Sequence, residues 1–346
     1  MPEPQREPSI RPAPTRRRAA RKRLVLIAFV AAVLGLVPAT TATAAASPTR
    51  AATGGTSSGT YFAGVYASLG GVHPYHGYVP SSYRPGTPMP LLVALHGCTE
   101  NDIGFDLLSG WSARAEQRGF IVVFPEQPVL HNPAACWNWM LPFDQHRGGP
   151  EPSAIVGIAD LVRGRYTVDA HRVYVTGVSA GGCMANIMAV TYPDVFAAVS
   201  ILAGCEYKAG VITHRPPAES GRDAYREMGG RARAVPTLIF QGTADKIVPP
   251  DTADRIVGQW VETDNLAGVD VQAAPAQVIP GQVPGGRSYT RSIYRTSAGA
   301  ALVEKYMING AGHVYPGGCW CSLYGDPSGP DATGITWDFF LAHPKP

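Results

Sequence analysis

The sequence predicts an α/β fold in which a mostly parallel sheet is covered by helices on both faces. Three observations indicate it: continuous apolar runs of strand length, amphipathic segments that alternate with them, and a chain long enough for one large core. Strands that are apolar throughout are usually buried on both faces, as parallel strands are. Right-handed connections then place the loops after the strands at one edge of the sheet, where we expect functional residues.

The first predicted elements lie between residues 91 and 177. LLVALHG (91–97) and FIVVF (120–124) read as buried strands, because each run is continuously apolar. The segment between them, FDLLSGWSARAEQR (105–118), has helical spacing, as does SAIVGIADLVRGRY (153–166). RVYVTG (172–177) follows as a strand rich in β-branched residues.

The second half of the chain continues this alternation. VFAAVSILAG (195–204) and TLIFQG (237–242) predict further buried strands. PDTADRIVGQWVETDN (250–265) and DATGITWDFFLAH (331–343) predict helices, because each has Pro or Asp near its start.

The first 46 residues have the pattern of a secretory signal peptide. A basic run, RRRAARKR, precedes an apolar stretch from Leu24 to Val37, and small residues follow it. This stretch is short for a membrane span, which favours a cleaved signal over an uncleaved anchor. The arginines at 16–18 hint at twin-arginine export, and general secretion stays open. We therefore expect a secreted, extracellular protein without a membrane association after cleavage.

Removal of the predicted signal peptide reverses the net charge. The whole chain carries 29 Lys/Arg and 26 Asp/Glu; residues 1–46 hold eight and two of these, so 21 and 24 remain, a net charge of −3. No Lys/Arg cluster remains, which argues against nucleic acid or anionic lipid as a partner. Residues 47–59 predict a flexible lead-in, and residues 60–346 a single domain that we expect to be monomeric.

One serine lies between glycines at a predicted strand-to-helix turn. Gly177-Val178-Ser179-Ala180-Gly181 matches the pattern G-x-S-x-G, directly after the strand at 172–177. Side chains two residues before and after a serine in such a strained turn would collide with the turn and the sheet, and glycine avoids this. The next helix directs its free N–H groups toward the reacting oxygen. We therefore predict that Ser179 is a nucleophile.

A nucleophilic serine needs a histidine base and a carboxylate that orients it. Asp245 follows the strand at 237–242, and His313 follows an apolar run in a glycine-rich turn. The chain order Ser, Asp, His is the one expected after this kind of turn. Taken singly, Asp245 could be a turn residue and His313 a surface residue, but order and position together favour a triad. Other acidic and histidine residues fit less well, namely Asp251, Asp254, His343 and His96.

Backbone N–H groups are expected to bind the oxyanion formed by such a nucleophile. We assign them to Ala180, directly after the serine, and to Cys98, at the end of the strand at 91–97. His96 is a candidate substrate contact, with support of the turn as its alternative. Trp137 and Trp139 are also candidate substrate contacts, because exposed aromatics offer rigid apolar area, with core packing as their alternative. We expect neither a metal nor an organic cofactor.

All six cysteines follow the predicted signal peptide, and an oxidising compartment lets disulfides persist. Sequence alone does not select among the possible pairings. A Cys98–Cys136 bridge would hold the CWNWM loop beside the oxyanion turn, and a Cys183–Cys205 bridge would join the helix after Ser179 to the following strand. For Cys319-Trp320-Cys321, a local bridge and two free thiols both stay open.

Several segments resemble those of a known family, the extracellular poly(3-hydroxybutyrate) depolymerase-like esterases, related to feruloyl and acetylxylan esterases. The segments run from about Tyr75 to Pro344: LHGCTEN, GFIVVFPEQ, CWNWM, RVYVTGVSAGGCMA, YPDVFAAVSILAG, FQGTADKIVPP, GAGHVYPGG and DPSGPDATGITWDFFLAHP. The resemblance implies an α/β-hydrolase fold with Ser179 as nucleophile, Asp245 as orienting acid and His313 as base.

The same resemblance implies a secreted serine esterase that cleaves aliphatic polyesters or their oligomers. An esterase acting on feruloyl or acetyl groups of plant polysaccharide is the alternative, and a non-catalytic binding protein on this scaffold is a remote one. Polyester-degrading members often carry a separate polymer-binding domain, whereas this sequence ends at Pro346 after its last predicted helix. We therefore expect action on soluble or amorphous esters rather than on crystalline polymer.

Overall fold

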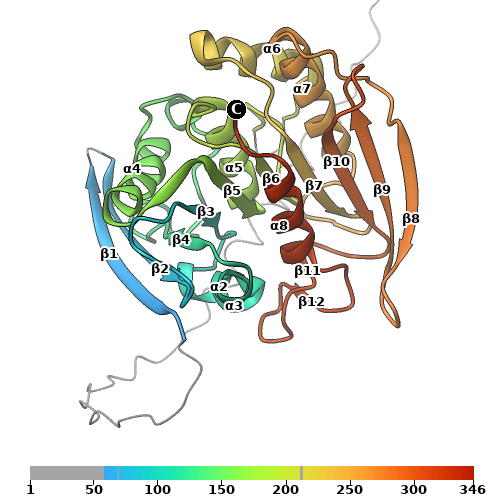
Figure 1. Cartoon of the computed structure of the whole chain (residues 1–346). Helices are drawn as coiled ribbons and strands as arrows, with labels where there is room; N and C mark the ends of the chain where they lie inside the picture. Colours follow the sequence, from blue (N-terminus) through green and yellow to red (C-terminus); the bar gives the residue numbers. More distant parts are fainter. Residues whose placement is uncertain (1–57, 69, 211–212) are drawn as a thin grey trace, which may run out of the picture. The chain divides into compact units, whose positions relative to one another are not determined.

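A computed structural model describes residues 58–68, 70–210 and 213–346 (Figure 1). The predicted signal peptide, at 1–46, and nearly all of the predicted lead-in lie outside these residues. No helix in the described ranges has both the length and the apolar character needed to cross a bilayer.

A ten-stranded sheet forms the centre of the fold, in the order β1-β2-β4-β3-β5-β6-β7-β10-β9-β8. The six strands from β4 to β10 in this order pair in parallel, and antiparallel strands are added at both edges. The strand bounds are β1 Thr60–Ser68, β2 Gly71–Val79, β3 Met89–Leu95, β4 Ile121–Pro125, β5 Val168–Val178, β6 Val199–Leu202, β7 Thr237–Gly242, β8 Gln277–Gln282, β9 Ser288–Arg295 and β10 Ala301–Ile308. A second, small parallel pair joins β11 (Tyr315–Pro316) and β12 (Gly325–Asp326).

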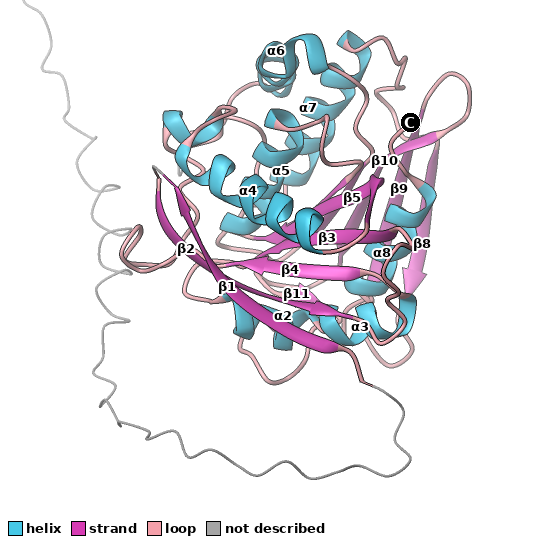
Figure 2. Ribbon diagram, turned by 60° about the vertical axis from the view of Figure 1, so that its left-hand side comes forward, coloured by secondary structure: helices cyan, strands magenta, loops and turns pink. Residues whose placement is uncertain are grey.

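Helices cover both faces of the large sheet (Figure 2). One face carries α2 (Asp102–Ser109), α3 (Trp111–Arg118) and α8 (Ala332–Ala342); the other carries α4 (Pro150–Arg165), α5 (Ala180–Thr191), α6 (Pro217–Met228) and α7 (Thr252–Leu266). Short 3₁₀ turns occur at Pro142–Gln145 and Gly229–Arg231.

The two faces have separate cores because side chains alternate along each strand. In β3, Leu91 and Val93 pack into the core under α4 and α5, whereas Leu92 packs under α2 and α3. Helices cover both faces of β3, so all three side chains are fully buried. The prediction of a mostly parallel sheet covered on both faces is therefore confirmed.

The structure departs from the sequence prediction at several elements. Helix α6 and the pair β11–β12 were not predicted. The helix expected at 105–118 is two helices, because Gly110 adopts a φ of 69° and its N–H bonds to Asp106 O, which ends α2. The antiparallel edge strands β1, β2, β8 and β9 were not predicted. Their residues are polar, glycine-containing or partly exposed, and β8 is exposed along nearly its whole length, so they lack the continuous apolar run of a central strand.

The parallel strands bring four loops to the same edge of the sheet. Leu95 at the end of β3 pairs with Gly177 in β5, and Ile308 at the end of β10 pairs with Gly242 at the end of β7. The segments that follow these strands contain the residues of the candidate site.

Candidate active site

Ser179 occupies a strained turn between β5 and α5. Its backbone has φ 57° and ψ −122°, a conformation that non-glycine residues rarely adopt. The turn is held by hydrogen bonds from Ser179 N to Leu202 O (2.9 Å) and from Cys183 N to Ser179 O (3.0 Å). This geometry places the hydroxyl at the end of the sheet, at the start of a helix.

The glycines on either side of Ser179 are required by close backbone contacts. A Cβ at Gly177 would lie 2.2 Å from Gly181 O, and a Cβ at Gly181 would lie 2.3 Å from Leu95 O. Both neighbours are backbone atoms, which cannot move aside as a flexible side chain can. The spacing G-x-S-x-G is therefore a packing requirement of this turn.

We expect Gly177→Ala to destabilise the protein by about 3 kcal/mol or more, since the new methyl group displaces backbone at the turn. Gly164→Ala is the matched control: Gly164 lies in α4, and beyond its chain neighbours and the adjacent helix backbone no atom lies within 4 Å of its ideal Cβ. That substitution should raise the free energy of unfolding by about 0.5–1 kcal/mol, because alanine is the better helix former. Urea unfolding of both variants measures this difference, and equal stabilities would contradict the packing argument.

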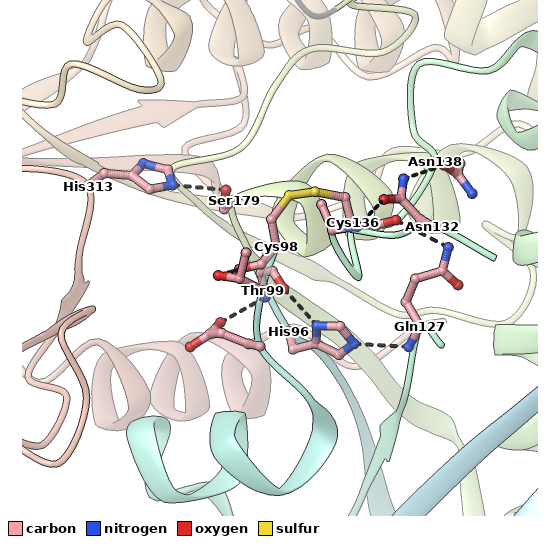
Figure 3. Close-up of a disulfide and its surroundings, with 12 residues drawn as sticks. His96, Cys98, Thr99, Gln127, Asn132, Cys136, Asn138, Ser179 and His313 are labelled. Atoms are coloured by element: carbon pink, nitrogen blue, oxygen red, sulfur yellow. Dashed lines mark hydrogen bonds between the residues drawn. A yellow bond between two sulfur atoms is a disulfide. The ribbon is translucent and has the colours of Figure 1, made fainter. Parts of the chain in front are cut away.

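The structure brings Ser179, His313 and Asp245 together in one hydrogen-bonded line. His313 Nε2 lies 2.9 Å from Ser179 Oγ, and His313 Nδ1 lies 2.8 Å from Asp245 Oδ2 (Figure 3 shows the first contact). A carboxylate only accepts, so the proton of the neutral imidazole is on Nδ1 and Nε2 is free to accept the serine proton. The arrangement can therefore move a proton away from the Ser179 hydroxyl.

Asp245 is buried and its carboxylate is fully occupied by donors. Besides His313, Gln241 Nε2 donates to Oδ2 (3.1 Å), and the backbone N–H groups of Ile247 and Val248 donate to Oδ1 (2.8 and 2.9 Å). Burial alone would raise the pKa of Asp245, but these hydrogen bonds, led by that of His313, hold it below its usual value. Asp245 thus stays ionised and orients the imidazole.

The N–H groups of Cys98 and Ala180 are the predicted oxyanion donors. Among the described residues none accepts a hydrogen bond from either N–H. Cys98 lines the same cavity as Ser179, and Ala180 is the first residue of α5, where N–H groups have no partner within the helix. Both amides thus remain available to a developing negative charge.

His96 holds the peptide that presents the Cys98 N–H. The backbone N–H of Gln127 donates to His96 Nε2 (3.0 Å), so the proton of the ring lies on Nδ1, which donates to Gly97 O (2.7 Å) (Figure 3). A trans peptide directs its C=O and N–H in opposite directions, so this bond aims the Cys98 N–H away from His96. Complete burial lowers the pKa of His96 to about 4, which keeps the ring neutral.

A buried carboxyl group supports the loop behind His96. Glu151 Oε1 accepts hydrogen bonds from Gln127 Nε2 (2.5 Å) and Asn138 Nδ2 (2.6 Å), and its Oε2 accepts one from Asn138 N (2.7 Å). Burial, together with the nearby Asp144, raises the pKa of Glu151 to about 8. The Glu151 side chain therefore joins the start of α4 to the segment that contacts His96.

Disulfides join the segments around the serine. The predicted Cys98–Cys136 and Cys183–Cys205 pairings are confirmed, and Cys319 bonds to Cys321, which decides between the two alternatives left open by the sequence. The first bridge links the turn that carries the Cys98 N–H to the CWNWM loop (Figure 3). The second links the helix after Ser179 to the segment after β6.

A cavity of about 220 Å³ opens over Ser179 and His313. Apart from Ser179 and His313, the wall of this cavity is mostly apolar or aromatic; these side chains are Val178, Ile247, Val314, Tyr315 and Tyr324. Glu100 also lines it; its carboxylate accepts a hydrogen bond from Gly97 N (2.9 Å), and burial raises its pKa. None of these wall residues was predicted from the sequence, and only Glu100 had a usable signal, since it closely follows the end of a strand.

None of the three predicted substrate contacts, Trp137, Trp139 and His96, lines the cavity over Ser179. Trp137 is fully buried in the core under α4 and α5, and His96 is fully buried behind the turn, so neither lines the cavity. Trp139 is half-buried against the Cys183–Cys205 bridge and is also absent from the cavity wall. For Trp137 and His96 the alternatives considered above, core packing and support of the turn, describe what the structure shows.

The weaker candidates of the sequence analysis lie away from Ser179. Asp251 occupies the N-cap position of α7 without a side-chain cap bond and pairs with Arg255, while Asp254 pairs with Lys305. His343 follows α8 and contacts the backbone oxygens of Phe339 and Ala301. Within the described ranges, no three His, Cys, Asp or Glu side chains are grouped as metal ligands.

The chain matches a known protein family over more than half of its length. Residues 74–275 match the family model described as "Esterase PHB depolymerase". The match includes Ser179 and Asp245 and ends before His313, whose position is known from the geometry above.

Two curated relatives resemble the chain in sequence. Poly(3-hydroxyalkanoate) depolymerase C of Paucimonas lemoignei is 34% identical over 251 residues, which cover 69% of this chain and 58% of the depolymerase. Feruloyl esterase B of Neurospora crassa is 33% identical over 263 residues, covering 69% of this chain and 82% of that protein. The chain thus spans little more than half the length of the depolymerase.

One solved structure resembles the chain in fold. The acetyl xylan esterase from Aspergillus awamori superposes with a TM-score of 0.60 at 22% identity, covering 74% of this chain and 94% of that one. At this identity the likeness concerns the fold: a mostly parallel sheet with helices on both faces.

Proposed function

The chain belongs to the PHB depolymerase family of esterases, so we propose that Ser179, His313 and Asp245 are its catalytic triad. Members of this family are carboxylic ester hydrolases, and the fold is that of an α/β-hydrolase. The observation that carries the proposal is the line of two hydrogen bonds, 2.9 and 2.8 Å long, that starts at a serine in a strained turn. Such a line is the arrangement a serine needs to become a nucleophile at neutral pH.

The first half of the reaction transfers the acyl group to Ser179. His313 Nε2 takes the hydroxyl proton as Oγ attacks the ester carbonyl, and Asp245 stabilises the imidazolium that forms. The carbonyl oxygen becomes an oxyanion, which the N–H groups of Cys98 and Ala180 bind. When the tetrahedral intermediate collapses, the bond to the alkoxy group breaks and His313 returns its proton to the leaving alcohol.

The second half repeats these steps with water. His313 takes a proton from a water molecule, whose oxygen attacks the acyl-enzyme carbonyl and forms a second oxyanion at the same two N–H groups. Collapse breaks the bond between the acyl carbon and Ser179 Oγ, and the proton on His313 returns to the serine. The products are a carboxylic acid and the free enzyme.

We propose aliphatic polyesters or their oligomers as substrates. The apolar wall formed by Ile247, Val314 and Tyr324 suits a short aliphatic acyl group, and one relative is named as a polyhydroxyalkanoate depolymerase. Hydrolysis of feruloyl or acetyl esters on polysaccharide is the second candidate. It is favoured by the match to feruloyl esterase B over 82% of that protein.

We also propose that the protein acts outside the cell. Disulfides join all six cysteines, which is typical of proteins matured in an oxidising compartment, and the leader at 1–46 has the pattern of a secretory signal.

A substrate panel tests the function. We expect kcat/KM for 3-hydroxybutyrate oligomers to exceed that for methyl ferulate and for acetylated xylo-oligosaccharides by about tenfold or more, as expected for a hydrophobic pocket that discriminates by about 1–3 kcal/mol. Initial rates followed by release of acid at constant pH compare all three on one scale. A preference for either carbohydrate ester would replace the polyester assignment, and hydrolysis of none would contradict the proposed function itself.

A further inference from the structure

Helix α2 has apolar side chains on both of its faces. Phe105 and Leu108 pack in the core beside the inward-facing Asp102 and Asp106, whereas Ile103 and Leu107, on one outer face four residues apart, are 59% and 65% exposed. Surface helices of soluble proteins normally bury their apolar stripe. The outer face of α2 is thus an exposed apolar stripe without a structural partner among the described residues.

The inward carboxylates of α2 have hydrogen-bond partners in the interior. Asp102 Oδ2 lies 2.9 Å from His76 Nδ1, and Asp106 accepts hydrogen bonds from Ser112 N and Ser112 Oγ (2.9 and 2.6 Å). Burial would lower the pKa of His76, but Asp102 and Asp106 raise it to about 9, so a cation balances them. Their hydrogen bonds therefore explain why Asp102 and Asp106 face inward. They do not explain why Ile103 and Leu107 are exposed.

The stripe on α2 is continuous with the active site. A second hollow, of about 310 Å³, is lined by Leu107 and shares Thr99, Glu100 and Tyr324 with the cavity over Ser179. A third hollow, of about 460 Å³, shares Leu107 with the second and is also lined by Ile103. We call the second and third hollows together the α2 groove; it leads from the Ser179 cavity along the outer face of α2.

The loop between β11 and β12 forms a rim on this groove. Cys321 and Tyr324 line the groove, and in the same loop Trp320 and Leu323 are 80% and 97% exposed. The loop is held by the Cys319–Cys321 bridge and by hydrogen bonds from Cys319 N to Leu108 O (3.1 Å) and between Tyr324 and Thr99 hydroxyls (3.0 Å). The rim therefore presents large apolar side chains on a fixed support.

We propose that the α2 groove and its rim bind the chain of an aliphatic polyester beyond the ester bond held at Ser179. The inference rests on the proposed function and extends it, because it names the surface that takes the rest of the polymer. Continuity with the cavity places a bound chain on both sites at once. The large exposed side chains along the groove and its rim are apolar or aromatic, which suits a chain of methylene and ester groups; they are Tyr61, Ile103, Leu107, Trp320 and Leu323.

The test compares long and short substrates in a double variant, Ile103→Gln with Leu107→Gln. Glutamine is a good helix former, so α2 should persist. We expect the ratio of kcat/KM on a 3-hydroxybutyrate hexamer to that on p-nitrophenyl acetate to fall about tenfold, through KM, as two partly buried aliphatic contacts are lost. Leu323→Ser should lower the same ratio. Leu161→Gln is the matched control, since Leu161 is 46% exposed on α4, on the other face of the sheet, and should leave the ratio within about twofold.

Three outcomes would overturn the inference. An unchanged ratio in the double variant would show that the groove takes no part in binding. An equal loss on acetylated xylo-oligosaccharides would show that the occupant is a sugar chain, while hydrolysis of p-nitrophenyl acetate would still support the esterase. Wild-type protein that hydrolyses neither the hexamer nor p-nitrophenyl acetate would refute the proposed function, and the inference with it.

Discussion

Ser179→Ala should lower kcat for p-nitrophenyl butyrate by about a million-fold, the largest effect expected of any single substitution in this chain. The hydroxyl is the atom that would form the acyl-enzyme, and among the described residues no other hydroxyl lies in hydrogen-bond contact with His313. Only binding and the two oxyanion N–H groups would remain to assist water, which leaves a small residual rate. Single-turnover and steady-state kinetics on the purified variant measure the loss.

The fold of this variant should be unchanged, since the Ser179 side chain contacts His313 through one hydrogen bond and the backbone of the turn is held by other groups. Its thermal unfolding is the control for folding. An alkyl phosphonate should label wild-type protein at Ser179 in a one-to-one ratio and leave the variant unlabelled. Activity or labelling retained by the alanine variant would rule out Ser179 as the nucleophile.

Asp245→Asn should lower kcat by about ten-thousand-fold through the tautomer of His313. Asparagine can still accept the hydrogen bonds of Ile247 N and Val248 N through its oxygen, but its NH₂ group would then face His313 Nδ1. That contact favours the tautomer with the proton on Nε2, which cannot accept the proton of Ser179. The loss should appear in kcat, because Asp245 does not line the cavity over Ser179.

Asp251→Asn is the matched control for this prediction. Asp251 is six residues further along, its side chain is largely exposed, and it pairs with Arg255 on the surface of α7. Exposed ion pairs contribute little, so activity should stay within about twofold of wild type. A loss of less than tenfold for Asp245→Asn, or a similar loss for both variants, would mean that Asp245 does not orient the base.

The sequence predicted those features whose position in the fold requires particular residues within a short segment. β3, β7 and the second half of β5 are recognisable because helices cover both faces of the sheet there, so side chains pointing to either face are buried. Ser179 is recognisable because backbone crowding at positions 177 and 181 requires glycine there, which produces the pattern G-x-S-x-G. Asp245 and His313 were found through chain order and position after strands, which reflect how parallel strands deliver loops to one edge.

Sequence was uninformative where burial depends on distant partners. Trp137 and Trp320 are both tryptophans next to a cysteine, yet the first is in the core and the second is on the rim of the α2 groove. Nothing local distinguishes them, since burial is decided by the elements that pack around each ring. The edge strands β1 and β8 were missed for the same reason, because pairing with β2 and β9 forms them despite their mixed composition.

The sequence by itself predicted the fold class, the candidate triad Ser179, Asp245 and His313, and the cysteines available for pairing, because local patterns and the order of residues along the chain indicate each of them. Only the tertiary structure decided that the hydroxyl, imidazole and carboxylate come within hydrogen-bond distance, which cysteines pair, and that the apolar stripe of α2 faces outward beside the Ser179 cavity. Hydrogen bonds and disulfides form only between atoms a few ångströms apart. Ser179 and His313 are 134 positions apart in the sequence, so their contact exists only once the sheet has brought the strand ends together.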